Sequence, residues 1–170
     1  LDLSFAVEKD LDGRTQNAEE FKFELTNALT GKLLDTAFNA GNGTVTFDPV
    51  TVHAAGNYHY RISEVDTGLG GVTYDHGLYD ILITVTDNGE GQLVESSRII
   101  KKDGVDQNSS TVVFSNRYEV ADAQLTFEGN KTLSGRPLEK GEFTFKIYET
   151  DATFALSAQA YDTVTNGEGG

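Results

Sequence analysis

In three segments of the chain apolar residues alternate with polar ones, and each time a polar residue takes the next place on the apolar face. In LDLSFAVEK the alternation ends at Lys9, in NYHYRISEV it ends at Glu64, and in TVVFSNRYEV it is interrupted by Asn116. Side chains of a strand point to opposite faces with a period of two. Lys9, Glu64 and Asn116 are therefore predicted to point into the core of the domain.

An amine, carboxyl or carboxamide group in a core costs several kcal/mol unless it has a partner. Three such residues in one small domain suggest that they are partners of one another. The alternative is that each residue closes a strand at the surface. In that case Lys9 extends to solvent, Glu64 caps a turn and Asn116 binds the backbone.

The remaining pattern predicts an all-β fold. Short runs rich in Val, Ile, Thr, Tyr and Phe lie between clusters of Gly, Asn and Asp, and no stretch sustains helical periodicity. The clearest hairpin lies in TVTDNGEGQLVES, with its turn at 87–91. About seven strands at this spacing favour an immunoglobulin-like β-sandwich. The strands are predicted near residues 1–9, 20–27, 43–47, 56–65, 78–87, 92–100 and 111–119.

An internal repeat predicts two domains. LSFAVEKDLDGR realigns without gaps on LTFEGNKTLSGR, which places Lys9 on Lys131 and Arg14 on Arg136. Such a register over more than twenty residues is typical of tandem repeats. We expect one complete domain at residues 1–120 and an incomplete second copy at residues 121–170.

The second copy contains counterparts of only the first two strands and ends before any counterpart of Glu64 or Asn116. Lys131 is therefore a candidate lysine without a partner in this chain. Two strands cannot bury a core unaided. We expect this segment to need support from elsewhere or to be poorly ordered. Arg14 and Arg136 are each predicted to pair with a local carboxylate at a turn; the less favoured alternative is a role in binding.

Composition narrows the function classes. The net charge of −14 argues against a nucleic acid or an anionic membrane as partner. No apolar run approaches the roughly 18 residues of a membrane span, and the start within a strand pattern suggests an excised fragment. The chain lacks cysteine, and its three histidines have no metal-ligand spacing, so we expect no disulfide, metal or cofactor. No motif supports catalysis with turnover.

The three polar residues predict a different chemistry. Burial lowers the pKa of a lysine, so that Lys9 can exist as a neutral nucleophile, and it keeps Glu64 protonated. A protonated Glu64 is predicted to donate a hydrogen bond to the Asn116 carbonyl and to assist attack by the amine. The products are ammonia and a Lys–Asn isopeptide bond. Packing of the strands supplies proximity worth about 7–11 kcal/mol of the barrier.

Several strings together resemble the pilin isopeptide-linkage domain of Gram-positive surface proteins, a family that includes the major shaft pilins of streptococci. The resemblance covers residues 1–119 and, as an incomplete copy, residues 121–170. It implies that Lys9 on the first strand bonds Asn116 on the last, assisted by Glu64 on a middle strand. The strings are KDLDGR, KTLSGRPLEKGEFTF, YHYRISEV, GGVTYD, YDILITVTDNGEGQL and VVFSNRYEV.

The resemblance also implies a function and a location. It indicates a structural module of a pilus subunit or adhesin stalk, outside the cell or in the cell wall, with neighbouring repeats or subunits as partners. Such a module is not an enzyme beyond its single self-cross-linking event. The main alternative is an adhesin domain that binds an unknown host protein or glycan through its loops, and a third is an accessory domain of a surface glycosidase. An adhesin predicts a large loop insertion, whereas the longest irregular stretch, 101–110, is short and polar.

Overall fold

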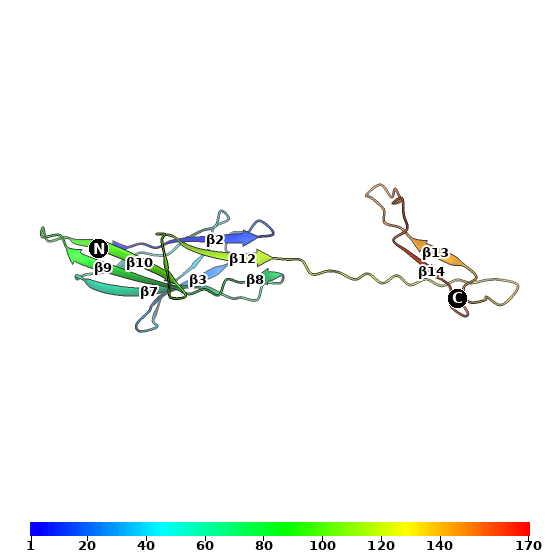
Figure 1. The fold of residues 1–170 in the computed structure, drawn as a ribbon, viewed down its shortest axis with the longest axis horizontal. Helices are drawn as coiled ribbons and strands as arrows, with labels where there is room; N and C mark the ends of the chain where they lie inside the picture. Colours follow the sequence, from blue (N-terminus) through cyan, green and yellow to red (C-terminus); the bar gives the residue numbers. More distant parts are fainter. The chain divides into compact units, whose positions relative to one another are not determined.

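The computed structural model describes residues 1–170 and divides them into two compact units, residues 1–121 and 122–170. Every regular element is a β-strand, so the predicted all-β class is confirmed (Figure 1). The chain contains no helix that is long and apolar enough to cross a membrane.

The first unit is a sandwich of a six-stranded and a four-stranded sheet, with an additional two-stranded pair. Its twelve strands are β1 (Asp2–Leu3), β2 (Ala6–Asp12), β3 (Lys22–Asn27), β4 (Leu33–Phe38), β5 (Thr44–Thr46), β6 (Val50–Thr51), β7 (Gly56–Val65), β8 (Val72–Thr73), β9 (Tyr79–Asp87), β10 (Leu93–Lys102), β11 (Val105–Gln107) and β12 (Val112–Tyr118). The six-stranded sheet has the order β11-β10-β9-β7-β3-β4, the four-stranded sheet has the order β5-β2-β12-β8, and β1 pairs with β6.

Strands β2 and β12, near the start and the end of the unit, lie side by side (Figure 1). They pair in parallel, whereas every other strand pair in the unit is antiparallel. In this register Lys9 is opposite Phe114 and Asn116 is opposite Leu11. Because side chains two residues apart share a face, Lys9 and Asn116 are diagonal neighbours on the same face of the sheet.

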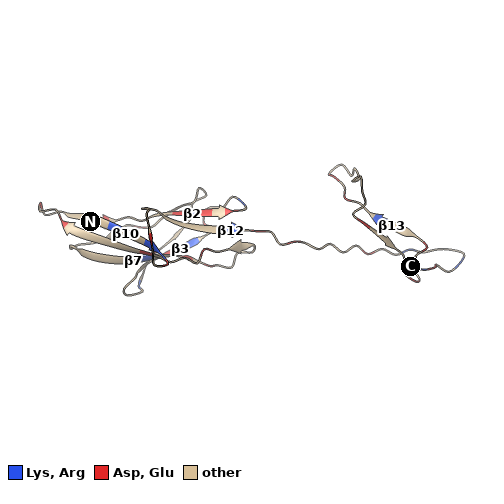
Figure 2. Cartoon of the chain, viewed as in Figure 1, with Lys and Arg blue, Asp and Glu red and all other residues tan.

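The core lies between the two sheets and is built by strict alternation. Strand β2 carries acidic residues, drawn in red in Figure 2. They are Glu8, Asp10 and Asp12, which are exposed and alternate with buried Val7 and Lys9. The most deeply buried side chains include aromatic rings from both sheets. Phe23 of β3 packs on Phe114 of β12 with ring centroids 5.3 Å apart, and Tyr79 of β9 packs on the same ring at 5.0 Å. These contacts hold the two sheets together across the site.

Each predicted strand corresponds to an observed one whose bounds differ by a few residues at most. The hairpin at 87–91 is confirmed between β9 and β10. The estimate of about seven strands was too low. Strand β4 was missed because it is the edge of its sheet, and only Ala37 among its residues is buried. Without a buried face, an edge strand has no alternation of apolar and polar residues to reveal it. The short strand β1 lies within the strand predicted at 1–9, whereas β6, β8 and β11 were not predicted. Strand β11 and the end of β10 lie within residues 101–110, which were expected to be irregular.

The second unit has one antiparallel pair, β13 (Thr144–Ile147) and β14 (Asp162–Thr165). Strand β13 aligns with β3 in the sequence repeat. The segment that aligns with β2, residues 128–134, is not a strand. In the first unit β2 is held by hydrogen bonds to β12 and β5. The second unit contains no counterpart of β12, so this segment lacks the neighbour that makes it a strand. That residues 121–170 are an incomplete copy of the first domain stays a prediction.

A buried asparagine anchors the turn region before β3. The Asn39 Oδ1 accepts a hydrogen bond from the Phe21 N–H (2.8 Å). Its Nδ2 donates to the carbonyl oxygens of Asn17 (2.7 Å) and Ala40 (3.0 Å). Asn39 is 1% exposed, so this one buried side chain satisfies three backbone groups, among them the buried N–H of Phe21.

The second unit repeats this anchor with Asn166. Its Oδ1 accepts from the Phe143 N–H (2.8 Å), and its Nδ2 donates to the carbonyl oxygens of Glu139 (2.8 Å) and Gly167 (3.0 Å). The two units therefore use the same local interactions before their paired strands, in agreement with the sequence repeat.

We expect Asn39→Ala to lower the free energy of unfolding by about 2 kcal/mol, because it leaves the buried N–H of Phe21 without a partner and removes two further hydrogen bonds. Denaturant titration with guanidinium chloride measures the loss. The matched control is Asn57→Ala, which removes an exposed hydrogen bond from Thr84. Equal effects of the two substitutions would contradict the role assigned to Asn39.

Candidate functional site

Three polar side chains meet in the core between the two sheets. Lys9 on β2 and Asn116 on β12 come from the four-stranded sheet and are 3% and 2% exposed. Glu64 comes from β7 in the six-stranded sheet, and its side chain is fully buried. The structure thus brings together the three residues named from the sequence, with Glu64 reaching across the sandwich.

The Glu64 carboxyl group lies between the amine and the carboxamide. The Asn116 Nδ2 donates a hydrogen bond to Glu64 Oε1 (2.7 Å). The Lys9 Nζ lies 3.7 Å from Glu64 Oε2, and this oxygen has no hydrogen-bond partner although it is buried. One carboxyl group therefore contacts one residue through each of its two oxygens.

The remaining contacts of the Lys9 amine are to the backbone and to an aromatic ring. Its Nζ donates to the carbonyl oxygens of Asp10 (2.8 Å) and Phe114 (3.2 Å). It also lies 4.7 Å from the centroid of the Phe21 ring. The side chain is held near β12 by these contacts.

Burial shifts the protonation of both ionisable groups toward their neutral forms. Burial lowers the pKa of Lys9, and the nearby carboxylates of Glu64 and Asp75 oppose this only in part. Burial likewise raises the pKa of Glu64 to about 7, against the opposing effects of Lys9 and of the hydrogen bond from Asn116. A proton held by Glu64 rather than by Lys9 gives a neutral amine next to a carboxylic acid, which is the state that nucleophilic attack requires.

The predicted hydrogen bond from Glu64 to the Asn116 carbonyl is absent. Instead, the backbone N–H of Asp75 donates to Asn116 Oδ1 (2.7 Å). Because a backbone N–H can only donate, the carbonyl oxygen must face Asp75, and the Asn116 amino group must then face Glu64. Sequence reasoning missed Asp75, since a backbone amide carries no residue-type signal.

The arginines of the repeat bind local carboxylates, as predicted. Arg14 forms an ion pair with Glu20, and its guanidinium carbon lies 4.6 Å from the Tyr118 ring centroid. Arg136 forms the corresponding pair with Glu142. These pairs stabilise turns and take no part in the three-residue cluster.

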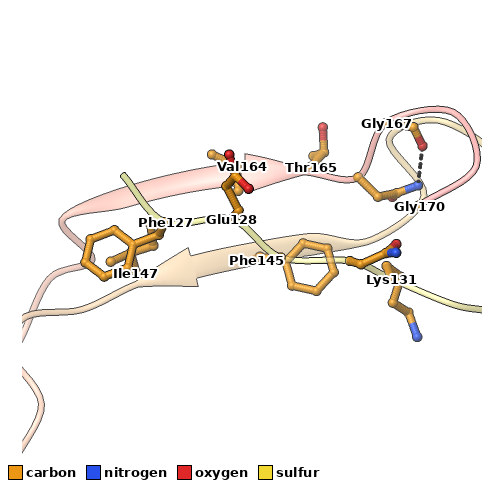
Figure 3. A pocket seen from close by; sticks show the side chains of 12 residues that line it. Phe127, Glu128, Lys131, Phe145, Ile147, Val164, Thr165, Gly167 and Gly170 are labelled. Carbon is orange, nitrogen blue, oxygen red and sulfur yellow. Dashed lines mark hydrogen bonds between the residues drawn. The ribbon is translucent and has the colours of Figure 1, made fainter. Parts of the chain in front are cut away.

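Two of the contacts that the Lys9 amine makes, one with the next backbone carbonyl and one with a Phe ring, have counterparts at Lys131. Its Nζ donates to the Thr132 carbonyl (3.1 Å) and lies 4.6 Å from the Phe143 ring centroid. It makes no hydrogen bond to a side chain and no ion pair. It lies instead at a pocket of about 310 Å³. Figure 3 shows this pocket, whose apolar lining includes Phe127, Phe145, Ile147 and Val164.

The comparison with protein families decides what kind of domain this is. The family described as the Spy0128-like isopeptide containing domain, FctA, matches residues 5–119. The chain belongs to this family. No curated protein is similar enough to count as a match.

Solved structures show the same fold. A point mutant of the major pilin from Streptococcus pyogenes aligns with 99% of this chain and 72% of its own, at 15% identity and a TM-score of 0.52. Another major pilin from Streptococcus pyogenes covers 99% of this chain and 74% of its own, at 19% identity and the same TM-score. A third major pilin from that species covers 98% and 76%, at 17% identity and a TM-score of 0.54. The fold is therefore pilin-like.

The raised pKa of Glu64 predicts how pH affects an unreacted protein. In Lys9→Met, which has no amine to react, we expect the free energy of unfolding to fall as pH rises from 4.5 through 7. Below the pKa that Glu64 has in the unfolded chain, Glu64 is protonated in both the folded and the unfolded state, and the protein has its full stability. As pH rises above that value, the unfolded chain releases the Glu64 proton first, and the free energy of unfolding falls by about 3 kcal/mol over this range. Loss of the Lys9 charge raises the pKa of Glu64 further and extends the decline above 7.

Urea midpoints measured across this range test the expectation. The control is the double variant Lys9→Met with Glu64→Gln, which retains every other titrating group. The difference between the two proteins should vary with pH in the stated direction. A difference that stays constant with pH would show that Glu64 is not a protonated buried acid.

Proposed function

We propose that residues 1–121 form a structural module of a Gram-positive pilus subunit or adhesin stalk, stiffened by an isopeptide bond between Lys9 and Asn116. Two findings support this: membership in the isopeptide-domain family and the pilin-like fold. The observation that carries the proposal is the buried Glu64 carboxyl group, which lies between the amine and the carboxamide.

The geometry supports a balanced condensation. The neutral Lys9 Nζ attacks Asn116 Cγ, so that an N–C bond forms and the Cγ–Nδ2 bond breaks. Glu64 donates its proton to the departing Nδ2 and takes one from Nζ, so ammonia leaves and Glu64 returns to its acid form. Packing of the strands holds the reacting groups together and removes the entropic cost of their encounter.

This reaction is a single event and not enzymatic turnover. Both reacting groups belong to the folded chain, and the product bond stays in the core, so no site is regenerated. Condensation also replaces an ionisable amine with a neutral amide. It thereby removes the cost of keeping an ionisable amine in the core, away from water.

The bond would close a loop of about 107 residues between Lys9 and Asn116. In the chain-entropy model a cross-link over such a loop contributes about 4–5 kcal/mol to stability. That is a third or more of the stability of a typical domain. The module would thus gain the robustness that disulfides provide in other extracellular domains, although the chain has no cysteine.

The placement of the bond suits a protein under tension. Lys9 lies near the start of the first unit and Asn116 near its end, on adjacent parallel strands. A force applied to the two ends of the unit would therefore pass from β2 to β12 through a covalent bond. The proposed partners are neighbouring subunits or repeats at the cell surface, as expected for a pilin-like protein.

Intact mass tests the bond directly. We expect the purified wild-type chain to weigh one ammonia less than its sequence. The deficit should disappear in Lys9→Met, Asn116→Ala and Glu64→Ala, because each lacks the nucleophile, the electrophile or the proton shuttle. Lys22→Met on β3 is the control and should keep the deficit. A wild-type mass equal to the sequence mass would refute the bond, whereas a deficit that survives in Glu64→Ala would refute only the role of Glu64.

Single-molecule pulling tests the mechanical role. We expect a cross-linked first unit held by its ends to show almost no unfolding extension. Asn116→Ala should release the roughly 107 residues between the two positions, at about 3.3–3.6 Å each. Full-length extension of a wild-type protein whose mass shows the bond would mean that the force does not pass through it.

A further inference from the structure

Asp75 lies in the loop between β8 and β9 and donates its backbone N–H to the carbonyl oxygen of Asn116 over 2.7 Å. In the proposed reaction this oxygen is the atom that gains negative charge when the amine attacks. A donor aimed at that position before the reaction lowers the barrier, because no reorganisation is needed as the charge develops.

The Asp75 side chain fixes the loop on which this donor lies. Its Oδ2 accepts hydrogen bonds from the Lys102 Nζ (2.7 Å) and from the Ser115 N–H (3.1 Å). Its Oδ1 accepts from the Gly77 N–H (2.9 Å). The contact with Ser115 attaches the loop to β12 at the residue before Asn116, so donor and acceptor are positioned through the same strand.

Two further contacts limit movement of this loop. The neighbouring Tyr74 is 7% exposed and packs on Phe21, with ring centroids 6.0 Å apart. The Lys102 amine also lies 5.2 Å from the Tyr79 ring centroid. Burial alone would raise the pKa of Asp75, but the hydrogen bonds from Lys102 and from the backbone outweigh it and hold the pKa below its ordinary value. The carboxylate therefore stays charged and keeps its partners.

We propose that the backbone amide of Asp75 is the oxyanion donor of isopeptide formation, and that the Asp75–Lys102 ion pair positions it. The inference rests on the proposed function and extends it. Glu64 then transfers protons for the amine and the leaving nitrogen, while the Asp75 N–H stabilises the negative charge on the carbonyl oxygen. The tetrahedral intermediate has its oxyanion on Oδ1, and this charge returns to the carbonyl when the Cγ–Nδ2 bond breaks.

The direct test removes one backbone hydrogen-bond donor and leaves every side chain in place. In cell-free translation of the full chain, a suppressor tRNA delivers the α-hydroxy analogue of aspartate at position 75, so an ester oxygen replaces the N–H. After translation is stopped, samples are quenched over time and the loss of ammonia is followed by intact mass. We expect the rate constant to fall about 10²–10³-fold, the cost of removing one oxyanion donor.

The matched control is the same ester substitution at Val72, whose N–H donates to the Leu69 carbonyl (3.1 Å) away from the reacting atoms. Protease digestion of parallel samples measures the fraction of folded chains, and the rate constants are compared for folded chains only. Rate constants for the two esters that agree within about threefold would overturn the role of the Asp75 amide. A wild-type chain that never loses ammonia would instead refute the proposed function itself, so the two failures are distinguishable.

The ion pair is tested with Lys102→Met, for which Lys101→Met is the control. Lys101 is the neighbouring residue on β10 and forms an exposed pair with Asp106. We expect Lys102→Met to slow the reaction about 10-fold or more through misplacement of the donor, with an unchanged midpoint of the pH–rate profile. Lys102→Arg should restore most of the rate. A shifted midpoint without a lower plateau would mean that Lys102 acts only through charge, which would overturn its positioning role.

Discussion

Burial of an amine and a carboxyl group in an apolar core is the constraint on which the first unit depends. The side chains of Lys9 and Glu64 are both fully buried, and a buried ion without compensation costs several kcal/mol. The fold compensates in two ways. Burial drives both groups toward their neutral forms, and backbone carbonyls on β2 and β12 accept hydrogen bonds from the amine. The fold therefore tolerates the cluster without any reaction, and the proposed condensation would remove the remaining cost of the buried amine.

The second unit has a single two-stranded sheet, so a comparison of the two units shows what a facing sheet contributes. In the sequence repeat, Phe127 aligns with Phe5 and Phe145 aligns with Phe23. The two rings of the first unit are 6% and 0% exposed, whereas those of the second are 67% and 42% exposed. The turn anchors are nevertheless alike in both units. Local hydrogen bonds therefore survive without a facing sheet, but burial of the core does not.

Much of the site could be predicted from the sequence, because strong alternation gave each position a face. Lys9, Glu64 and Asn116 follow apolar residues with a period of two, and this periodicity is a local property of each strand. The parallel pairing of β2 with β12 is different, since it joins strands about a hundred residues apart and depends on the whole sandwich. The Asp75 donor was invisible for another reason. It is a backbone group in an irregular loop, and its direction depends on tertiary contacts of Tyr74 and Lys102.

The division of the cluster between two sheets also determines at what stage of folding the proposed bond could form. Lys9 and Asn116 belong to one sheet and Glu64 to the other, so the proton shuttle is in place only after the sandwich has closed. In an unfolded chain the lysine is hydrated, charged and unreactive. A slip of β12 by one residue would turn Asn116 to the outer face of its sheet. The chemistry would then act as a proofreading step. A correctly folded chain would be cross-linked irreversibly, whereas a misfolded chain would remain without the bond and could unfold and refold.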